Sequence, residues 1–177
     1  MTQPSEDFPL VIHAQYVKDL SFENPNAPGV LAQLADSPPQ VNVNIDVDVR
    51  HVHERTYEVV LSLRAGATVA DKPAFLIELA YGGLAAVGQQ VPEDRMEPLL
   101  YVEMSRHLFP FARAALADLT RDGGFPPLLI NPIDFEQFYR RHKVGALRAA
   151  GSDAPAAETA APEAATDAAA ADGQGGA

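Results

Sequence analysis

The amino-acid sequence predicts an α+β fold, with one four-stranded antiparallel sheet and with a long helix and a short C-terminal helix on one face of that sheet. Three observations support this class. Apolar residues recur at every second position over much of the segment from Leu10 to about Val87, as they do in half-buried strands. After Glu93 they recur at spacings of three and four, which is typical of an amphipathic helix. The predicted strands all precede the predicted helices, an order typical of α+β domains.

Four segments carry the strand pattern. From Val41 to Val49, valine and isoleucine alternate with asparagine and aspartate, and the segment from Tyr57 to Leu63 repeats the alternation after a polar turn, which predicts a hairpin. The segment from Leu10 to Tyr16 predicts a first strand. The run "PAFLIELAYGGL", residues 73–84, predicts a fourth strand in which the Gly-Gly pair marks a bend or a bulge. Four such strands with short connections predict one antiparallel sheet with an apolar and a polar face.

The helical part begins near Glu93. Pro110 predicts a bend or a local break in the long helix, and the pair Gly123-Gly124 predicts its end. The later run "DFEQFYRRHK" predicts a short last helix with Asp134 as its N-cap. The apolar stripe of the long helix is broad, so we expect a second copy of the chain to cover part of it. This stripe comprises Leu99, Val102, Leu108, Ala112, Ala115, Leu116 and Leu119.

Composition excludes several classes of function. The chain has 13 Lys and Arg residues against 24 Asp and Glu residues, and its net charge of −11 disfavours nucleic acid and anionic membranes as partners. It contains no cysteine, which excludes disulfides and thiolate chemistry. The N-terminal "MTQPSEDFPL" lacks the features of a secretory signal, and no apolar run is long enough to span a bilayer. We therefore expect a cytoplasmic protein without direct membrane insertion.

The C-terminal segment has a different composition from the rest of the 177 residues. It is rich in alanine, glycine, proline and acids, and no large aliphatic or aromatic residue follows Leu147. Such a segment has almost nothing to bury against the entropy cost of ordering, so we expect it to be disordered. A solubilising extension is a better interpretation of it than a specific binding motif. The predicted organisation is a flexible N-terminus at 1–8, a folded domain at 9–148 and a disordered tail at 149–177.

No residue pattern predicts an active site. The run "HVHE" (His51, His53 and Glu54) is the best metal candidate, because side chains two apart on a strand share a face. It falls at the predicted hairpin turn, where a solvated turn is the better interpretation. Ser62 lacks the glycine-flanked elbow of a nucleophile, and "YGGLAAVG" lacks the phosphate-binding spacing of glycines. The sequence predicts no metal, no cofactor and no enzymatic activity.

Two groups of residues remain open to a functional interpretation. The run "YVKDLSFENPNAPGVL", residues 16–31, places Asp19 and Glu23 beside Leu20 and Phe22. This run is either a strand end in a solvated turn or a docking surface. Aromatic residues in and beside the strands are either core residues or the lining of a groove for an extended peptide.

Four blocks, "YVKDLSFENPNAP", "AFLIELAYGGL", "LFPFAR" and "DGGFPPLLINPIDFEQFY", resemble the SecB family of proteobacterial export chaperones. The likeness keeps the same order from about Phe8 to Tyr139. The resemblance implies a homotetramer, a dimer of dimers with the sheets outside and the long helices between them. It also implies a holdase that needs no ATP, binds unfolded preproteins in the cytosol and delivers them to the SecA motor.

The resemblance further implies which residues bind these partners. An acidic face of the sheet docks a basic, zinc-carrying C-terminal segment of SecA, and the residues that match it are Asp19, Glu23, Leu76 and Glu78. Ile77 is then expected to face the opposite side of the strand, towards an intersubunit contact. The residues that best match a separate groove for client peptides are Tyr16, Leu20, Phe22, Phe75 and Tyr81.

Two other functions stay open. One is a SecB-like chaperone dedicated to a different client, such as an antitoxin, which would have no need of the docking acids. The other is a small hydrolase or metal-binding enzyme, which the absence of a catalytic constellation disfavours.

Overall fold

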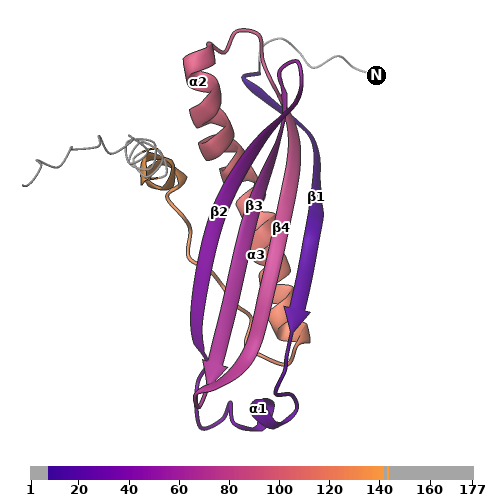
Figure 1. The fold of residues 1–177 in the computed structure, drawn as a ribbon, viewed down its shortest axis with the longest axis vertical. Coiled ribbons are helices and arrows are strands. Elements are labelled where there is room, and N and C mark those ends of the chain that lie inside the picture. The colour runs from indigo at the N-terminus through magenta and orange to yellow at the C-terminus, as the bar shows by residue number, and fades with distance from the viewer. Residues whose placement is uncertain (1–7, 142, 144–177) are drawn as a thin grey trace, which may run out of the picture.

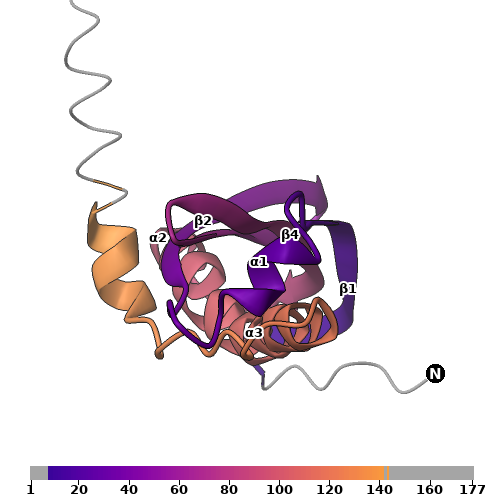
Figure 2. The ribbon, with the colours of Figure 1, turned by 90° about the horizontal axis from the view of Figure 1, so that it is seen from below.

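The computed structural model describes residues 8–141 and 143 of the chain. One four-stranded sheet forms a layer on one side, and a run of helices packs along the other side (Figures 1 and 2). Neighbouring strands are all antiparallel and their order is β1-β4-β3-β2, so β1 and β2 are the edges. The strands are β1 (Leu10–Glu23), β2 (Gln40–His53), β3 (Thr56–Val69) and β4 (Lys72–Val87). The α+β fold with one antiparallel sheet is therefore confirmed.

The long helical segment and the short last helix follow the strands, as predicted, and one further helix was not predicted. A short helix α1 (Gly29–Ala32) lies in the connection between β1 and β2. After the sheet come α2 (Glu93–Pro98), the π-helix η1 (Leu99–Met104) and α3 (Ser105–Asp122), which form one continuous rod. Residues 135–141 and 143 form the short last helix. The Asp134 carboxylate accepts a hydrogen bond from the Gln137 N–H at 3.0 Å, which confirms the predicted N-cap.

The core lies between the sheet and the helical rod. Alternate residues of β3 and β4 point towards the rod, and four of the largest, Leu61, Leu63, Ile77 and Leu79, are at most 2% exposed. We call this side of the sheet the inner face and the opposite side the outer face. Because Ile77 is fully enclosed within its own subunit, the expectation that it contacts another subunit is wrong.

The buried positions of the rod differ from the predicted stripe. Leu99, Ala115 and Leu119 are only partly buried. The rod also contains the π-helix η1, whose turns hold more residues than α-turns. The helix α3 also continues through Pro110 without interruption and ends before Gly123, so the predicted end is confirmed and a break at Pro110 is not. One row of fully buried residues recurs at every fourth position, namely Leu100, Met104, Leu108, Ala112, Leu116 and Thr120, and Ser105 beside it is also fully buried.

The edge strand β1 extends seven residues beyond the predicted strand end at Tyr16. Its pairing with β4 is shifted between Ile12 and Ala14 and again between Val17 and Asp19, and at the second shift Lys18 has no cross-strand partner. Such a β-bulge adds one residue to the strand, so that Val17 and Leu20, three apart, both point to the inner face. This break in the period of two hid the second half of the strand from the sequence pattern.

The Gly82-Gly83 pair marks neither a bend nor a bulge, because both glycines pair in regular register with β1 and β3. The two glycines instead permit close approach on both faces of β4. A Cβ atom on Gly82 would lie 2.8 Å from the Tyr16 ring on the outer face. A Cβ atom on Gly83 would lie 2.2 Å from the Met104 methyl group on the inner face.

Two parts of the predicted organisation fall outside the described residues. These are residues 1–7 of the expected flexible N-terminus and the whole of the expected disordered tail at 149–177. Both expectations stay predictions.

Candidate docking surface

The four residues matched to SecA docking lie together on the outer face. Antiparallel pairing of β1 with β4 sets Glu23 opposite Leu76, and Ser21 opposite Glu78. Directly opposed residues share a face of a sheet, and Asp19 falls on the same face two positions before Ser21. We call Asp19, Glu23, Leu76 and Glu78 the acidic face. Its apolar member, Leu76, is 44% exposed.

The acids of this face differ in their partners. Glu78 lies opposite Arg64 in the register of β3 and β4, and Arg64 Nε is 3.2 Å from Glu78 Oε1. Both side chains are exposed, so this ion pair is weak and a competing cation can displace it. Within residues 8–141 and 143, neither Asp19 nor Glu23 forms an ion pair. These two carboxylates therefore offer their full charge to a cationic ligand.

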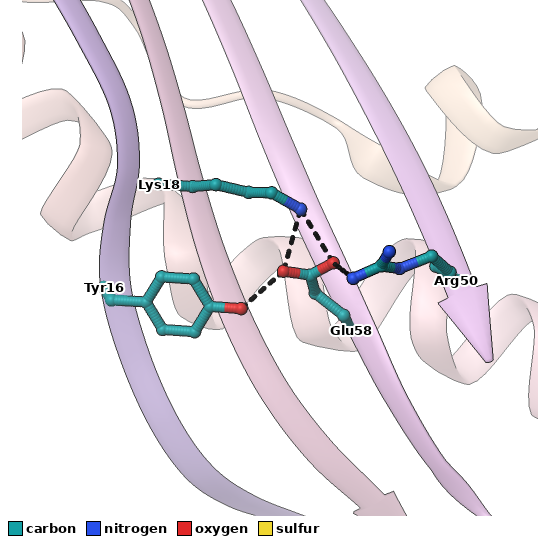
Figure 3. Close-up of polar contacts among 4 residues, drawn as sticks. All are labelled: Tyr16, Lys18, Arg50 and Glu58. Carbon is teal, nitrogen blue, oxygen red and sulfur yellow. Dashed lines mark hydrogen bonds and ion pairs between the residues drawn. The ribbon is translucent and has the colours of Figure 1, made fainter. Parts of the chain in front are cut away.

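Next to the acidic face, a buried carboxylate gathers three donors from both edge strands (Figure 3). The Glu58 side chain is only 6% exposed. Lys18 Nζ donates to both of its oxygens at 2.9 and 2.8 Å, and the Tyr16 hydroxyl donates at 2.5 Å. Arg50 Nη2 donates from β2 at 2.8 Å. Because Gly82 has no side chain, the Tyr16 ring can cross over β4 to reach Glu58 on β3.

These hydrogen bonds set the charge states of the network. The Lys18 ammonium and then the Tyr16 hydroxyl hold the pKa of Glu58 below its usual value, against the opposing effect of burial. The same contact with the Glu58 carboxylate, together with burial, raises the pKa of Tyr16. At neutral pH the network therefore contains one carboxylate, two cations and a protonated phenol.

The residues matched to a client groove divide between the two faces. Tyr16 lies on the outer face, whereas Leu20, Phe22, Phe75 and Tyr81 lie on the inner side. Phe22 stacks on Phe75 with ring centroids 6.4 Å apart. Phe75 also meets Phe125 edge-on at 5.1 Å. The structure thus brings together a pair of these residues, adds Phe125 and separates Tyr16 from all of them.

A second group of apolar residues lines the β1 edge of the inner side. Tyr81 stacks on Phe111 of α3 with ring centroids 6.3 Å apart and an interplanar angle of 6°. Phe111 is 54% exposed, and the neighbouring Val17 and Leu20 are 48% and 43% exposed. We call Val17, Leu20, Tyr81 and Phe111 the apolar strip.

His51 of the predicted metal candidate contacts the hairpin turn. His51 Nε2 lies 2.7 Å from the Glu54 carbonyl oxygen, and the His51 ring meets Tyr57 edge-on. In the described part of the chain, no group of three or more His, Cys, Asp or Glu residues could hold a metal ion. Among the helices of residues 8–141 and 143, none has the length and hydropathy that a membrane span requires.

Sequence analysis did not identify three residues that shape this surface, namely Lys18, Glu58 and Arg64. Glu58 sits in a strand whose alternation predicts a solvent-exposed polar residue, and nothing local in the sequence reveals its burial under Tyr16. Arg64 could have been found, because a hairpin-paired arginine opposite a glutamate is a common cross-strand pair. Its register with Glu78 requires knowing where β4 begins.

The fold defines the class of this protein. It matches that of a SecB-like chaperone from Mycobacterium tuberculosis, solved in complex with a peptide from an antitoxin, with a TM-score of 0.59. The match covers 71% of this chain and 91% of that chain at 14% identity. The fold is thus that of the SecB-like chaperones.

Sequence comparison then gives the family. Residues 3–145 match the family model described as preprotein translocase subunit SecB. The "Protein-export protein SecB" of Parvibaculum lavamentivorans is 51% identical over 82% of this chain and 86% of its own length. The protein of the same name from Rhodospirillum rubrum is 46% identical over 90% and 96%, and that from Sinorhizobium fredii is 54% identical over 73% and 77%. The chain belongs to the SecB family of export chaperones.

Proposed function

We propose that this chain is an ATP-independent holdase that binds unfolded preproteins in the cytosol, keeps them competent for translocation and delivers them to SecA. The observation that carries the SecA step is the acidic face, where Asp19 and Glu23 have free carboxylates beside the exposed Leu76. Free acids around an apolar residue suit a basic segment with some apolar side chains, such as the zinc-carrying C-terminal segment of SecA. The chaperone itself is expected to have no enzymatic activity and to need no cofactor.

Isothermal titration of the full-length protein with the C-terminal segment of SecA from the same organism tests the docking step. The wild type is expected to bind, and binding should weaken at raised salt because the acids and the cations attract over distances that salt screens. Glu78→Lys removes an acid and adds a like charge opposite the ligand. It is expected to weaken binding by roughly 10- to 100-fold.

Asp46→Lys is the matched control for this variant. Asp46 is exposed on the same outer face but belongs to β2, the opposite edge of the sheet. Asp46→Lys changes the net charge by the same amount as Glu78→Lys. If its affinity for the SecA segment stays within about twofold of the wild type, docking depends on local charge and not on total charge. Equal losses in both variants, or no binding by the wild type, would contradict the acidic face as the docking site.

Client binding is proposed to use the aromatic residues at the end of the sheet where β1 meets the segment after α3. Phe22, Phe75 and Phe125 form one aromatic cluster there, and Phe22 is only partly buried. Rigid aromatic rings suit the binding of many unfolded sequences, because they offer a large contact area at a small entropy cost. Phe22→Ser is expected to weaken binding of a reduced, unfolded client without changing titration of the acidic face by the SecA segment.

A dimer of dimers is proposed as the working assembly. The apolar strip supports it, because three of its four side chains are more than 40% exposed and they adjoin the edge strand β1. A chaperone dedicated to an antitoxin is not favoured, since relatives 46% to 54% identical are named as protein-export proteins.

A further inference from the structure

The bulge in β1 places a lysine directly beside a docking acid. Because Lys18 is the extra residue of the bulge, Lys18 and Asp19 both point to the outer face, although they are neighbours in the sequence. A free ammonium at this position would compete with any cationic ligand for Asp19. The acidic face therefore needs this charge to be held elsewhere.

Glu58 provides that partner. Both of its oxygens accept from Lys18 Nζ, at 2.9 and 2.8 Å, and its side chain is nearly buried. Figure 3 shows the Lys18 side chain extending from β1 across β4 to reach Glu58 on β3. A two-oxygen acceptor fixes the ammonium more firmly than a single exposed carboxylate such as Asp19 can.

We infer that Glu58 is a positioning residue for SecA docking: it holds the Lys18 ammonium away from Asp19 and so keeps the acidic face free for a cationic segment. This inference rests on the proposed function of that face. It assigns to the buried carboxylate an electrostatic role beyond stabilising the sheet. Loss of Glu58 would then weaken docking because Lys18 is released, and removal of Lys18 in the same chain would restore it.

The experiment compares four full-length proteins by titration with the same SecA segment at low salt. Glu58→Gln keeps the shape of the side chain and removes its charge, and it is expected to weaken binding by roughly three- to tenfold through the released lysine. Lys18→Met alone should bind as tightly as the wild type or more tightly. Glu58→Gln with Lys18→Met should return to within about twofold of the wild type.

Arg50 supplies the matched control, because it also donates to Glu58 but from β2, the edge farthest from Asp19. Glu58→Gln with Arg50→Met should therefore stay as weak as Glu58→Gln alone. Raised salt should shrink the difference between Glu58→Gln and the wild type, since salt screens a released surface charge and does not repair a distorted strand. Thermal unfolding of each variant reports whether its fold is kept.

The outcomes separate this inference from the proposed function. Weaker binding by Lys18→Met, or a double variant at least as weak as Glu58→Gln, would overturn the inference and make Glu58 a purely structural residue. Equal binding by Glu58→Gln and the wild type would overturn it too, while the docking function stands. If the wild type does not bind the segment at all, the proposed function and the inference both fall.

Discussion

At the scale of single residues, Gly82 decides how the outer face is built. The Tyr16 ring lies over this glycine, within 2.8 Å of where a Cβ atom would be, and its hydroxyl then reaches Glu58. Any larger side chain would lift the ring from the sheet. The hydrogen bonds of the network thus depend on a residue that takes no part in them.

Gly82→Ala is expected to lower the free energy of unfolding by about 1–3 kcal/mol, because the added methyl group overlaps the Tyr16 ring. The measurement is urea unfolding followed by circular dichroism. A double variant with Tyr16→Ala should lose less than the sum of the two single variants, since the overlap disappears with the ring. Gly29→Ala is the control, because nothing lies within 4 Å of its added Cβ atom. Strict additivity would contradict the overlap.

Acid unfolding depends on Glu58 in a defined direction. The folded protein holds the pKa of Glu58 below its ordinary value of 4.5, so the folded state binds fewer protons than the unfolded state. The stability from Glu58 is therefore complete above about pH 4.5 and is lost as the pH falls through the lower folded-state pKa. In urea titrations, the stability difference between wild type and Glu58→Gln should be largest near neutral pH and should narrow below pH 4.5. A constant difference would show that Glu58 is not ionised there.

At the scale of elements, regular patterns could be read from the sequence and irregular ones could not. The alternation from Val41 to Val49 predicted most of β2, because this strand pairs without a shift until its last residues. The alternation did not predict the part of β1 after Tyr16, because the bulge at Lys18 breaks the period of two. The residue that bulges here, Lys18, contacts Glu58 on β3, a strand that the local pattern around Tyr16 does not reveal.

The candidate site, like the fold, could be predicted from the sequence only in part. The acids and Leu76 could be matched residue by residue to a family, and the register places them on one face. The groove residues could not be sorted into faces, since Tyr16 and Leu20 share parity in the sequence but lie on opposite sides of the sheet. A bulge between them reverses the parity.

The segment after α3 is tied down by one buried hydroxyl. Thr120 Oγ1 accepts a hydrogen bond from the Leu128 N–H at 2.9 Å, and it donates to the Leu116 carbonyl at 3.0 Å. Thr120 is fully buried, so no water can replace this contact readily. Residues 125–134, which follow Gly124 and form no helix or strand, are thus joined to α3 by a specific contact.

Thr120→Val keeps the shape and leaves the Leu128 N–H without its acceptor. We expect the free energy of unfolding to fall by about 1–3 kcal/mol and the Leu128 amide to exchange with solvent hydrogen faster. Hydrogen exchange resolved by residue, with urea unfolding, measures both. The control is Thr68→Val on the exposed side of β3, where the change should stay within about 0.5 kcal/mol. Unchanged exchange at Leu128 would mean that other contacts hold the segment.

At the scale of the whole molecule, the two sides of β1 have different surfaces. The outer side carries free carboxylates, and the inner side carries the apolar strip. Charge keeps the outer side hydrated and available to a partner in solution, whereas the strip gains free energy when another surface covers it. One edge strand can therefore take part in docking and in assembly at the same time.

Phe111→Ser is expected to weaken assembly without unfolding the subunit, because Phe111 is 54% exposed and stacks on Tyr81 at the surface. Sedimentation velocity at several protein concentrations should show dissociation at higher concentrations than for the wild type. Val52→Ser removes a similarly exposed apolar residue from the hairpin between β2 and β3 and should leave assembly unchanged. Assembly that is insensitive to Phe111→Ser would exclude the strip from the subunit contacts.

In evolutionary terms, the bulge at Lys18 is equivalent to a one-residue insertion that the strand tolerates without a change in the pairing of its neighbours. Without Lys18, Val17 would still face Tyr81 and Asp19 would still face Ala80, and the ladder would be unbroken from Ala14 to Glu23. Deletion of the Lys18 codon removes the ion pair between Lys18 and Glu58, and each side chain from Asp19 to Glu23 stays on the same face of the sheet. Loss of a codon between Asp19 and Glu23 turns the rest of the strand over unless the bulge takes up the change. β1 can thus vary in length at the bulge, and farther along it can vary freely only in the identity of its residues.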